Sequence, residues 1–461
     1  MKYIDLFSGC GGLSLGFEAE GLKLALAVEK SPMAAETFYH NLIGPIQDNE
    51  KWNRYLEDES KQIKHKLYVG EIRNILDNKK LIENLKNIDI VAGGPPCQGF
   101  SLAGKRNPKD QRNELPYQFI KYIEHFKPKA FLMENVVGMR QNFKNHEQEA
   151  PFHQISKYIT EELDYEVQEL QLNAMHYGVA QHRPRVFLIG VQKKIAKRNK
   201  LKATDSLWNS SDYYSTGYLP SMCPMPTMRK GEYNTVQDAI SDLHETLKYK
   251  NHTSDYINKI NNVFKDNIKN KNKVPRSVET QLNHKMRNHS DRVINRFALY
   301  HHLSPMIFNL AANYTSSTNS SEKRNITRKI NKLLDAVNTP LVLQLNEKKV
   351  IYHNKEDLRK AVFSLATKKH SQRALKNNAP SPTVVSIPDD VVHPELARTV
   401  TIREQARFQS FPDNFEFRGK ETTGGQMRKK DVPQYTQVGN AIPPLLAFEL
   451  AKHIKKLVKN K

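Results

Sequence analysis

Cysteine is scarce in this chain of 461 residues, which contains only three. Cys10, Cys97 and Cys223 are widely separated and form no CxxC pair. An odd number of isolated cysteines does not suit a disulfide framework, so we expect a reducing compartment.

Long apolar stretches are also lacking. No run of 18 apolar residues occurs, and the first residues, MKYIDLFSGCGG, contain no apolar signal core. From these absences we expect neither a transmembrane helix of ordinary length nor a secretory leader. We therefore expect a soluble, cytoplasmic protein that does not engage a membrane.

Acidic residues are too few to balance the basic ones. Lys and Arg number 71 against 49 Asp and Glu, which gives a formal net charge of +22. A surplus of this size indicates a polyanionic partner, most often nucleic acid, although a generally basic solvated surface is the alternative.

The length favours two domains. Short apolar runs alternate with amphipathic stretches up to about residue 190, which predicts a doubly wound, mostly parallel α/β sheet. The expected strands are 2–7, 22–28, 88–93, 129–135 and 185–191, and the expected helices are 13–20, 31–41 and 115–126.

The alternation stops in a basic middle region that is rich in Lys and Asn, and it returns near residue 379. There SPTVVSI (381–387) resembles a strand, and 401–410 and 443–458 have helical patterns. We expect one body from residues 1–191 and 379–461, with 192–378 inserted as a second domain.

A glycine-rich turn follows the first expected strand. Gly9 and Gly11 permit a sharp turn that brings backbone N–H groups toward a ligand. Glu29 ends the next apolar run, where a carboxylate can accept both hydroxyls of a ribose. The spacing is not G-x-G-x-x-G, so an adenosine-type ligand is favoured over a dinucleotide, and a purely structural turn is the alternative.

Cys97 lies in the stretch GGPPCQGFS (93–101), directly after an expected strand. Only a thiolate is a good nucleophile. The prolines before Cys97 restrict the backbone and the glycine after it allows movement, which suits a nucleophile that meets its substrate beside a mobile loop. A buried small hydrophobe is the alternative for an isolated cysteine.

Three charged residues are candidates for the same sheet edge. Glu134 ends the apolar run AFLM, where burial can shift its pKa and suit it to act as a general acid. Arg183 and Arg185 share a face if their segment is a strand, and they can orient a carboxylate or bind a phosphate. A structural ion pair is the alternative for each of the three, and a helix N-cap is a further alternative for Glu134.

Together these motifs closely resemble the cytosine-C5 DNA methyltransferase family. The matching segments, in order, are DLFSGCGGLSLGFEAEG, GPPCQGFS, MENV, QHRPRVFLIG, RTVTIREQARFQSFPDNF and QVGNAIPPLLA. The resemblance covers about residues 1–191 and 379–461, and it implies a class I, Rossmann-like methyltransferase fold.

The resemblance also implies the site. Cys97 would add to C6 of a flipped cytosine, Glu134 would act at ring N3, and Arg183 and Arg185 would hold the base and the acid. S-adenosylmethionine would be the cofactor, with no metal. Its contacts would come from Phe7, Gly9, Gly11, Glu29, Glu71, Ile72, Pro96 and Asn440.

Two positions depart from the family pattern. Glu71 stands where many members have the aspartate that meets adenine, and Lys30 stands where some have an aromatic that stacks on it. The loop 98–112 is basic and would close over the base, and 192–378 corresponds to the target recognition domain.

We therefore expect a monomeric DNA (cytosine-5-)-methyltransferase that acts on double-stranded DNA, with a bacterial restriction endonuclease as its functional partner. An RNA methyltransferase acting on tRNA and a non-catalytic DNA-binding protein on the same fold are the alternatives. A nicotinamide oxidoreductase is disfavoured by the missing G-x-G-x-x-G.

Overall fold

The computed structural model describes residues 1–96, 114–140, 150–243, 253–275, 277–278, 280–345, 348–425, 427 and 430–459. Within them the chain forms two compact units. Unit 1 comprises 1–283, 379–386 and 403–461, and unit 2 comprises 284–378 and 387–402. Cys97 and the predicted closing loop 98–112 lie outside the described residues.

Unit 1 is built on a sheet that has eight strands in the described part of the chain. Neighbouring strands from β3 to β5 are parallel, β7 is antiparallel to both β5 and β6, and β8 is parallel to β6. In spatial order the strands are β3 (Leu67–Val69), β2 (Lys23–Glu29), β1 (Lys2–Leu6), β4 (Ile90–Gly93), β5 (Ala130–Asn135), β7 (Pro184–Gln192), β6 (Tyr165–Asn173) and β8 (Trp208–Asn209). The mostly parallel α/β sheet expected from the sequence is thus confirmed.

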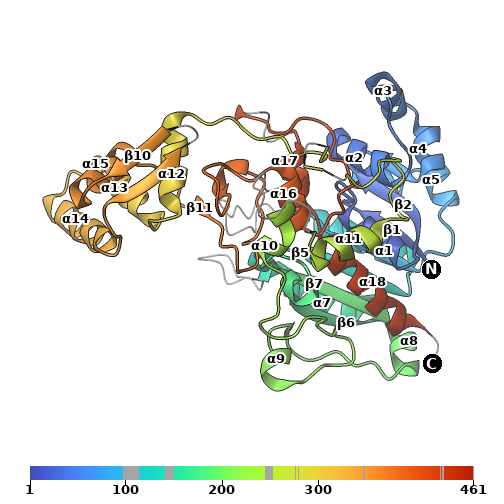
Figure 1. Ribbon diagram of the computed structural model, residues 1–461. Helices are drawn as coiled ribbons and strands as arrows, with labels where there is room; N and C mark the ends of the chain where they lie inside the picture. The colour runs from blue at the N-terminus through green and yellow to red at the C-terminus, as the bar shows by residue number, and fades with distance from the viewer. Residues whose placement is uncertain are drawn as a thin grey trace. The chain divides into compact units, whose positions relative to one another are not determined.

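The two faces of this sheet are both covered by helices (Figure 1). The helices of unit 1 are α1 (Gly12–Ala19), α2 (Pro32–Leu42), α3 (Asn49–Glu57), α4 (Glu59–His65), α5 (Lys79–Glu83), α6 (Leu115–Phe126), α7 (Pro151–Glu162), α8 (Lys193–Arg198), α9 (Tyr213–Thr216), α10 (Val236–Ile240), α11 (Asp255–Phe264), α17 (Gln434–Asn440) and α18 (Pro444–Val458). Helix α16 (Ile402–Phe408) begins at the last residue of unit 2 and continues in unit 1.

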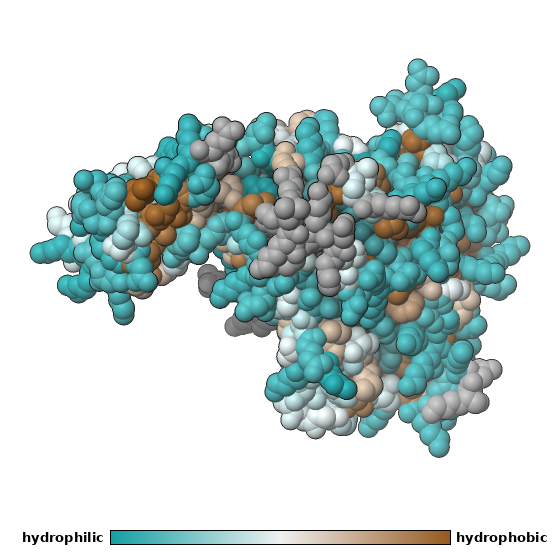
Figure 2. All heavy atoms as spheres, viewed as in Figure 1, coloured by the Kyte–Doolittle hydropathy of each residue, from teal (hydrophilic) through white to brown (hydrophobic). Residues whose placement is uncertain are grey.

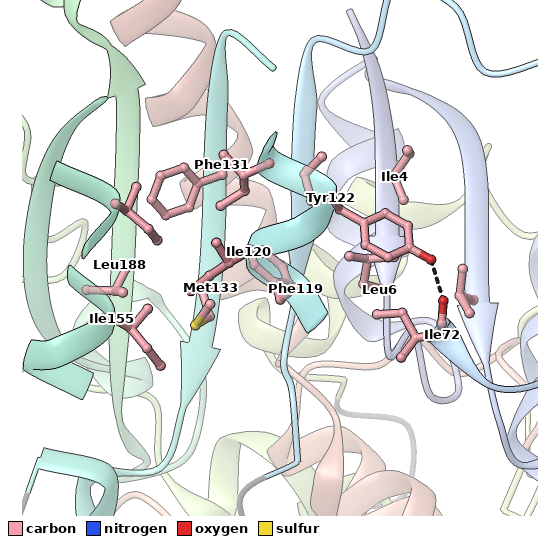
Figure 3. Close-up of a cluster of buried hydrophobic side chains, with 14 of the residues drawn as sticks. Ile4, Leu6, Ile72, Phe119, Ile120, Tyr122, Phe131, Met133, Ile155 and Leu188 are labelled. Carbon is pink, nitrogen blue, oxygen red and sulfur yellow. Dashed lines mark hydrogen bonds between the residues drawn. The ribbon is translucent and has the colours of Figure 1, made fainter. Parts of the chain in front are cut away.

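Strand β1 carries apolar side chains on both of its faces. Ile4 and Leu6 point into a buried cluster that includes Phe119 and Ile120 of α6 and Ile155 of α7 (Figure 3). Tyr3 is buried on the opposite face, where its ring meets that of Phe17 in α1. A strand with apolar side chains on both sides must lie inside a layered structure.

The C-terminal helix completes this layered unit, as the sequence predicted. Helix α18 packs along α1, so a segment near the start of the sequence and one near its end lie side by side (Figure 1). A Cβ on Gly16 would come within 2.5 Å of backbone atoms of Pro444 and Phe448, so only glycine allows this approach.

One strand expected from the sequence is absent, and the sheet contains strands that were not expected. Residues 381–387 are not a strand, because Pro380, Pro382 and Pro388 provide no N–H donors and only Ser381 forms a bridge, to Gln181. Strand β6 was not expected, and it pairs antiparallel with β7 through most of its length.

The unit boundaries also differ from the boundaries drawn at residues 191 and 379, since 192–283 belong to unit 1. The buried Arg407 of α16 bonds both Asp242 and Asp413, and its carbonyl accepts a 2.6 Å hydrogen bond from Tyr256 of α11. These contacts fix α10 and α11 to the body. That the basic middle region recognises DNA remains a prediction.

Unit 2 is a small helical unit with short strands. Its elements are α12 (Asp291–Tyr300), α13 (Met306–Ser316), α14 (Ser320–Asp335), β9 (Leu341–Leu345), β10 (Lys348–Tyr352), α15 (Lys355–Ser364), β11 (Arg373–Ala374) and β12 (Val391–Val392). Strands β9 and β10 form a hairpin, and β11 pairs with β12. Its own apolar cluster includes Phe297, Ile307, Ile330 and Val362, so it has a separate core.

The face of the molecule shown in Figure 2 is largely hydrophilic. Among the described helices, none has the length and apolar character needed to span a bilayer.

Candidate active site

The predicted catalytic acid lies at the carboxyl end of β5. The Nε atom of Arg185 lies 3.2 Å from Oε1 of Glu134, and each side chain is 14% exposed. Because β7 runs antiparallel to β5, the start of β7 lies beside the end of β5, with Glu134 opposite Phe187. This reversal brings Arg185 to the acid.

Burial and charge act in opposite directions on Glu134. Burial raises the pKa of Glu134 above its usual value, and the nearby guanidinium groups of Arg185 and Arg183 lower it in part. The net result is a raised pKa, so the protonated acid persists to higher pH than in an ordinary glutamate. Such a group can donate a proton or hydrogen bond to a ring nitrogen.

The nucleophile motif begins next to this acid. A Cβ on Gly94 would lie only 3.0 Å from Oε2 of Glu134, so the segment that follows β4 passes directly by the carboxylate. The Nδ2 group of Asn135 donates a 3.0 Å hydrogen bond to the carbonyl of Pro95. Pro96 is exposed, and Cys97 follows it outside the described residues.

Asn135 is a contributor that the sequence analysis did not single out. It is only 2% exposed, and its side-chain oxygen accepts from the backbone N–H of Val136. The available signal was an amide directly after the acid, at the end of the strand. Asn135 therefore fixes the Pro-Pro segment that leads to Cys97.

Arg183 has a different environment from Arg185. It is fully buried, and its guanidinium donates to the carbonyls of Gly439 (2.8 Å), Ala441 (3.1 Å) and Val384 (3.4 Å). Arg183 thus holds the turn after α17 against the start of β7. Asn440 stands between the two anchored carbonyls and is exposed.

The glycine-rich turn forms a loop closed by Glu29. Phe7, Gly9 and Gly11 all have positive φ, at 61°, 55° and 99°. The two carboxylate oxygens of Glu29 accept from the backbone N–H groups of Gly9 (2.8 Å) and Ser31 (2.7 Å). Burial raises the pKa of Glu29, and these hydrogen bonds oppose the rise.

This loop fits the cofactor expected from the resemblance. A Cβ on Gly9 would meet no described atom within 4 Å, so the backbone there is open to a ligand. A carboxylate has about four acceptor positions, so Glu29 retains capacity for ribose hydroxyls after its two backbone bonds. The donor and acceptor pattern suits the adenosine part of S-adenosylmethionine.

Glu71 and Ile72 lie after β3, beside the end of β2. Ile72 is buried, and its carbonyl accepts a 2.7 Å hydrogen bond from Tyr122 (Figure 3). The Nζ atom of Lys30 lies 2.5 Å from Oε1 of Glu71. The two residues that depart from the family pattern therefore pair with each other, which the sequence did not indicate.

Within unit 1 the structure brings the predicted residues to the carboxyl ends of neighbouring strands. Gly9 follows β1, Glu29 ends β2, Glu71 follows β3, Pro96 follows β4 and Glu134 is the last residue but one of β5. Ligands of open α/β sheets bind outside these ends. No group of three or more His, Cys, Asp or Glu suited to a metal occurs among the described residues.

Comparison with known proteins identifies the family of this chain. The C-5 cytosine-specific DNA methylase family model matches residues 1–456. The Type II methyltransferase M.DdeI of Desulfomicrobium norvegicum is 31% identical over 464 residues, covering 100% of this chain and 90% of the relative. The Type II methyltransferase M.AgeI of Thalassovita gelatinovora is 28% identical, covering 99% of each.

A solved structure shares the fold. The crystal structure of a candidate DNA modification methyltransferase from an E. coli prophage aligns with a TM-score of 0.56 and 22% identity, over 99% of each chain. Since the family model spans nearly the whole chain, the chain belongs to the C-5 cytosine-specific DNA methylase family.

Proposed function

We propose that this enzyme methylates C5 of one cytosine within a specific duplex DNA sequence, with S-adenosylmethionine as the donor and Cys97 as the nucleophile. The observation that carries the proposal is the contact of Glu134 with Arg185, immediately beside the segment that leads to Cys97. A carboxyl group with a raised pKa, held by a guanidinium beside the segment that leads to Cys97, suits a mechanism that needs both an acid and a thiol.

The chemistry requires activation of an unreactive carbon. The thiolate of Cys97 adds to C6 of the base while Glu134 protonates or hydrogen-bonds N3, so electron density accumulates at C5. S-adenosylmethionine, when bound, supplies an electrophilic methyl group. C5 would form a bond to this methyl group as the methyl–sulfur bond breaks, which would leave S-adenosylhomocysteine. The C5 proton then leaves to a base, the electrons of that bond expel the Cys97 thiolate from C6, and a proton donated to N3 returns to Glu134.

The chain's residues hold the participants in place. Arg185 orients the carboxyl of Glu134, and Asn135 fixes the start of the Pro-Pro segment. Glu29, Glu71, Ile72 and the loop around Gly9 would hold the adenosine part of the cofactor, with Phe7, Gly11, Pro96 and Asn440 around its other parts. The target nucleotide must leave the helix, which costs a few kcal/mol.

The names of the two relatives support a proposal about the biological role of this enzyme. M.DdeI and M.AgeI are both Type II methyltransferases, so we propose that this enzyme protects bacterial DNA from a restriction endonuclease of the same specificity. The proposal includes a cytoplasmic, monomeric enzyme with residues 192–378 as the main source of DNA recognition.

The deciding experiment measures transfer of labelled methyl groups to duplex DNA and to tRNA, together with adduct formation on DNA containing 5-fluorocytosine. Wild type should methylate the duplex and form a covalent adduct, because fluorine cannot leave as a proton does. Cys97→Ser should do neither and should still bind DNA. Methylation of tRNA alone, or full turnover by the Cys97→Ser variant, would refute the proposal.

A further inference from the structure

The β9–β10 hairpin of unit 2 has one covered face and one open face. Its register pairs Val342 with Ile351 and Gln344 with Lys349. Leu343 and Tyr352 are buried in the core of unit 2, with Leu341, Leu345 and Val350 packed against it. The opposite face therefore carries the remaining side chains outward.

The open face has an unusual composition. Val342 is 47% exposed and Ile351 is 39% exposed, and they stand directly opposite each other. Lys349 and Gln344, the neighbouring pair on the same face, are exposed as well. The solvent face of a two-stranded ribbon is ordinarily polar, so an opposed pair of aliphatic residues beside a cation indicates a contact surface.

The charge of this part of the chain indicates what kind of partner binds the open face of the hairpin. Lys and Arg far outnumber Asp and Glu between residues 284 and 378. Lys348 and Lys349 begin β10, and both are exposed. Of the two, Lys349 shares the open face with the aliphatic pair, whereas Lys348 stands opposite Leu345 and its Nζ atom lies 3.8 Å from Oδ2 of Asp291. Apolar residues beside a cation suit a polyanion that also presents apolar groups, and the major groove of DNA does so through the thymine C5-methyl.

The width of a two-stranded ribbon also fits the major groove of DNA. The major groove is about 12 Å wide and admits a two-stranded β-ribbon, whose outward side chains then reach base edges. A lysine can bind the O6 and N7 acceptors of guanine, and small aliphatic side chains pack on thymine methyl groups. The open face of this hairpin has both kinds of residue within two adjacent cross-strand pairs.

We propose that the outward face of the β9–β10 hairpin enters the major groove and reads part of the recognised sequence, a proposal that rests on the DNA methyltransferase function above. Lys349 hydrogen-bonds a guanine edge. Val342 and Ile351 contact a thymine methyl group. The recognised sequence therefore contains at least one A·T pair next to a G·C pair.

The test starts from the methylated sites. Sequencing methylated cytosines in DNA from cells that express wild type identifies the recognised sequence and supplies the duplex for binding titrations. Lys349→Ala should weaken binding to this duplex about ten-fold or more. Its binding to an unrelated duplex should change by about two-fold or less. Lys329→Ala, an exposed lysine on α14, is the matched control and should leave the ratio between the two duplexes unchanged.

A second measurement isolates the apolar pair. Replacing the contacted thymine by deoxyuridine removes one methyl group and should weaken binding of wild type about four-fold. The same replacement should have no further effect on a Val342→Ala/Ile351→Ala variant. Lys349, Val342 and Ile351 are all exposed, so neither the Lys349→Ala variant nor the double variant removes core packing.

Three results would overturn the inference. One is equal weakening of recognised and unrelated duplexes by Lys349→Ala, which marks a phosphate contact. Another is a recognised sequence made only of G·C pairs, and the third is an unchanged thymine dependence in the double variant. If wild type methylates DNA while one of these occurs, only the hairpin assignment fails. If wild type methylates no DNA, the proposed function fails and the hairpin assignment fails with it.

Discussion

Arg185 and Glu134 meet at 3.2 Å because β7 starts where β5 ends. The pair links the last arginine of the QHRPR segment to the acid of the MENV segment, two motifs separated by about fifty residues of sequence. Its charge also opposes the effect of burial on the pKa of Glu134. The arrangement gives a first prediction.

Replacing Arg185 by Gln should lower kcat about 100-fold, since a partner of a buried charged pair is lost. It should also move the alkaline limb of the pH–rate profile to higher pH. The reason is that loss of a positive neighbour raises the pKa of Glu134 further, so the protonated acid survives longer. Lys129→Gln, which breaks the 2.7 Å contact with Asp89 at the other end of β5, should leave the limb in place. If the alkaline limb does not shift in Arg185→Gln, then Arg185 does not influence the pKa of Glu134.

The Asn135–Pro95 hydrogen bond predicts a kinetic role for a residue that does not touch the base. Asn135→Asp keeps the shape of the side chain and removes the donor, so the Pro-Pro segment should lose its fixed position. The rate of adduct formation with 5-fluorocytosine DNA should fall at least ten-fold, with the Kd for DNA nearly unchanged. Gln192→Glu removes a similar 2.7 Å amide-to-carbonyl bond far from Glu134 and is the control. Equal trapping rates in both variants would contradict this role.

Most of what positions the site followed from local sequence. Apolar runs predicted β1, β2, β4, β5 and β7, and the parallel order of the first strands placed Glu29 and Glu134 at one edge. The antiparallel direction of β7 did not follow, because a strand's own residues do not specify its partner. The resemblance supplied the roles of the residues, which spacing alone left open.

Side-chain pairs across neighbouring elements were the part that sequence could not provide. Lys30 and Glu71 pair because β3 lies next to β2, and this order is set by the tertiary fold. Likewise the carbonyls that bind Arg183 come from segments about 200 and 260 residues further along the chain. Neither contact has a periodic or compositional signal.

Glu29 provides a prediction for cofactor binding that is independent of turnover. Glu29→Gln removes the charge and one of two acceptor oxygens, so the loop at Gly9 and the expected ribose contact are both weakened. The Kd for S-adenosylhomocysteine, measured by calorimetry, should rise by roughly 10- to 100-fold. Glu20→Gln, which breaks a contact with Lys455 on α18, should leave that Kd unaltered. An unchanged Kd in Glu29→Gln would show that the carboxylate of Glu29 does not contribute to cofactor binding.

Asp5 predicts how the stability of the enzyme depends on pH. It is buried beneath the glycine-rich turn, where Ser14 donates a 2.6 Å hydrogen bond to its carboxylate. Burial raises its pKa from 3.8 to about 7, and the hydrogen bond from Ser14 opposes the rise. The folded protein therefore binds this proton more tightly than the unfolded chain.

The sign follows from linkage. Between pH 4 and 7 the folded state holds a proton that the unfolded state has released, so the contribution of Asp5 to stability falls as the pH rises. It is fully present below pH 4 and lost above pH 7. Asp5→Asn cannot titrate, so the free energy of unfolding of this variant should fall less steeply with pH across that window, by roughly 1 kcal/mol per pH unit. Urea unfolding of both proteins at pH 5 and pH 8 measures the difference. Parallel pH profiles would show that Asp5 is already ionised in the folded enzyme at pH 5.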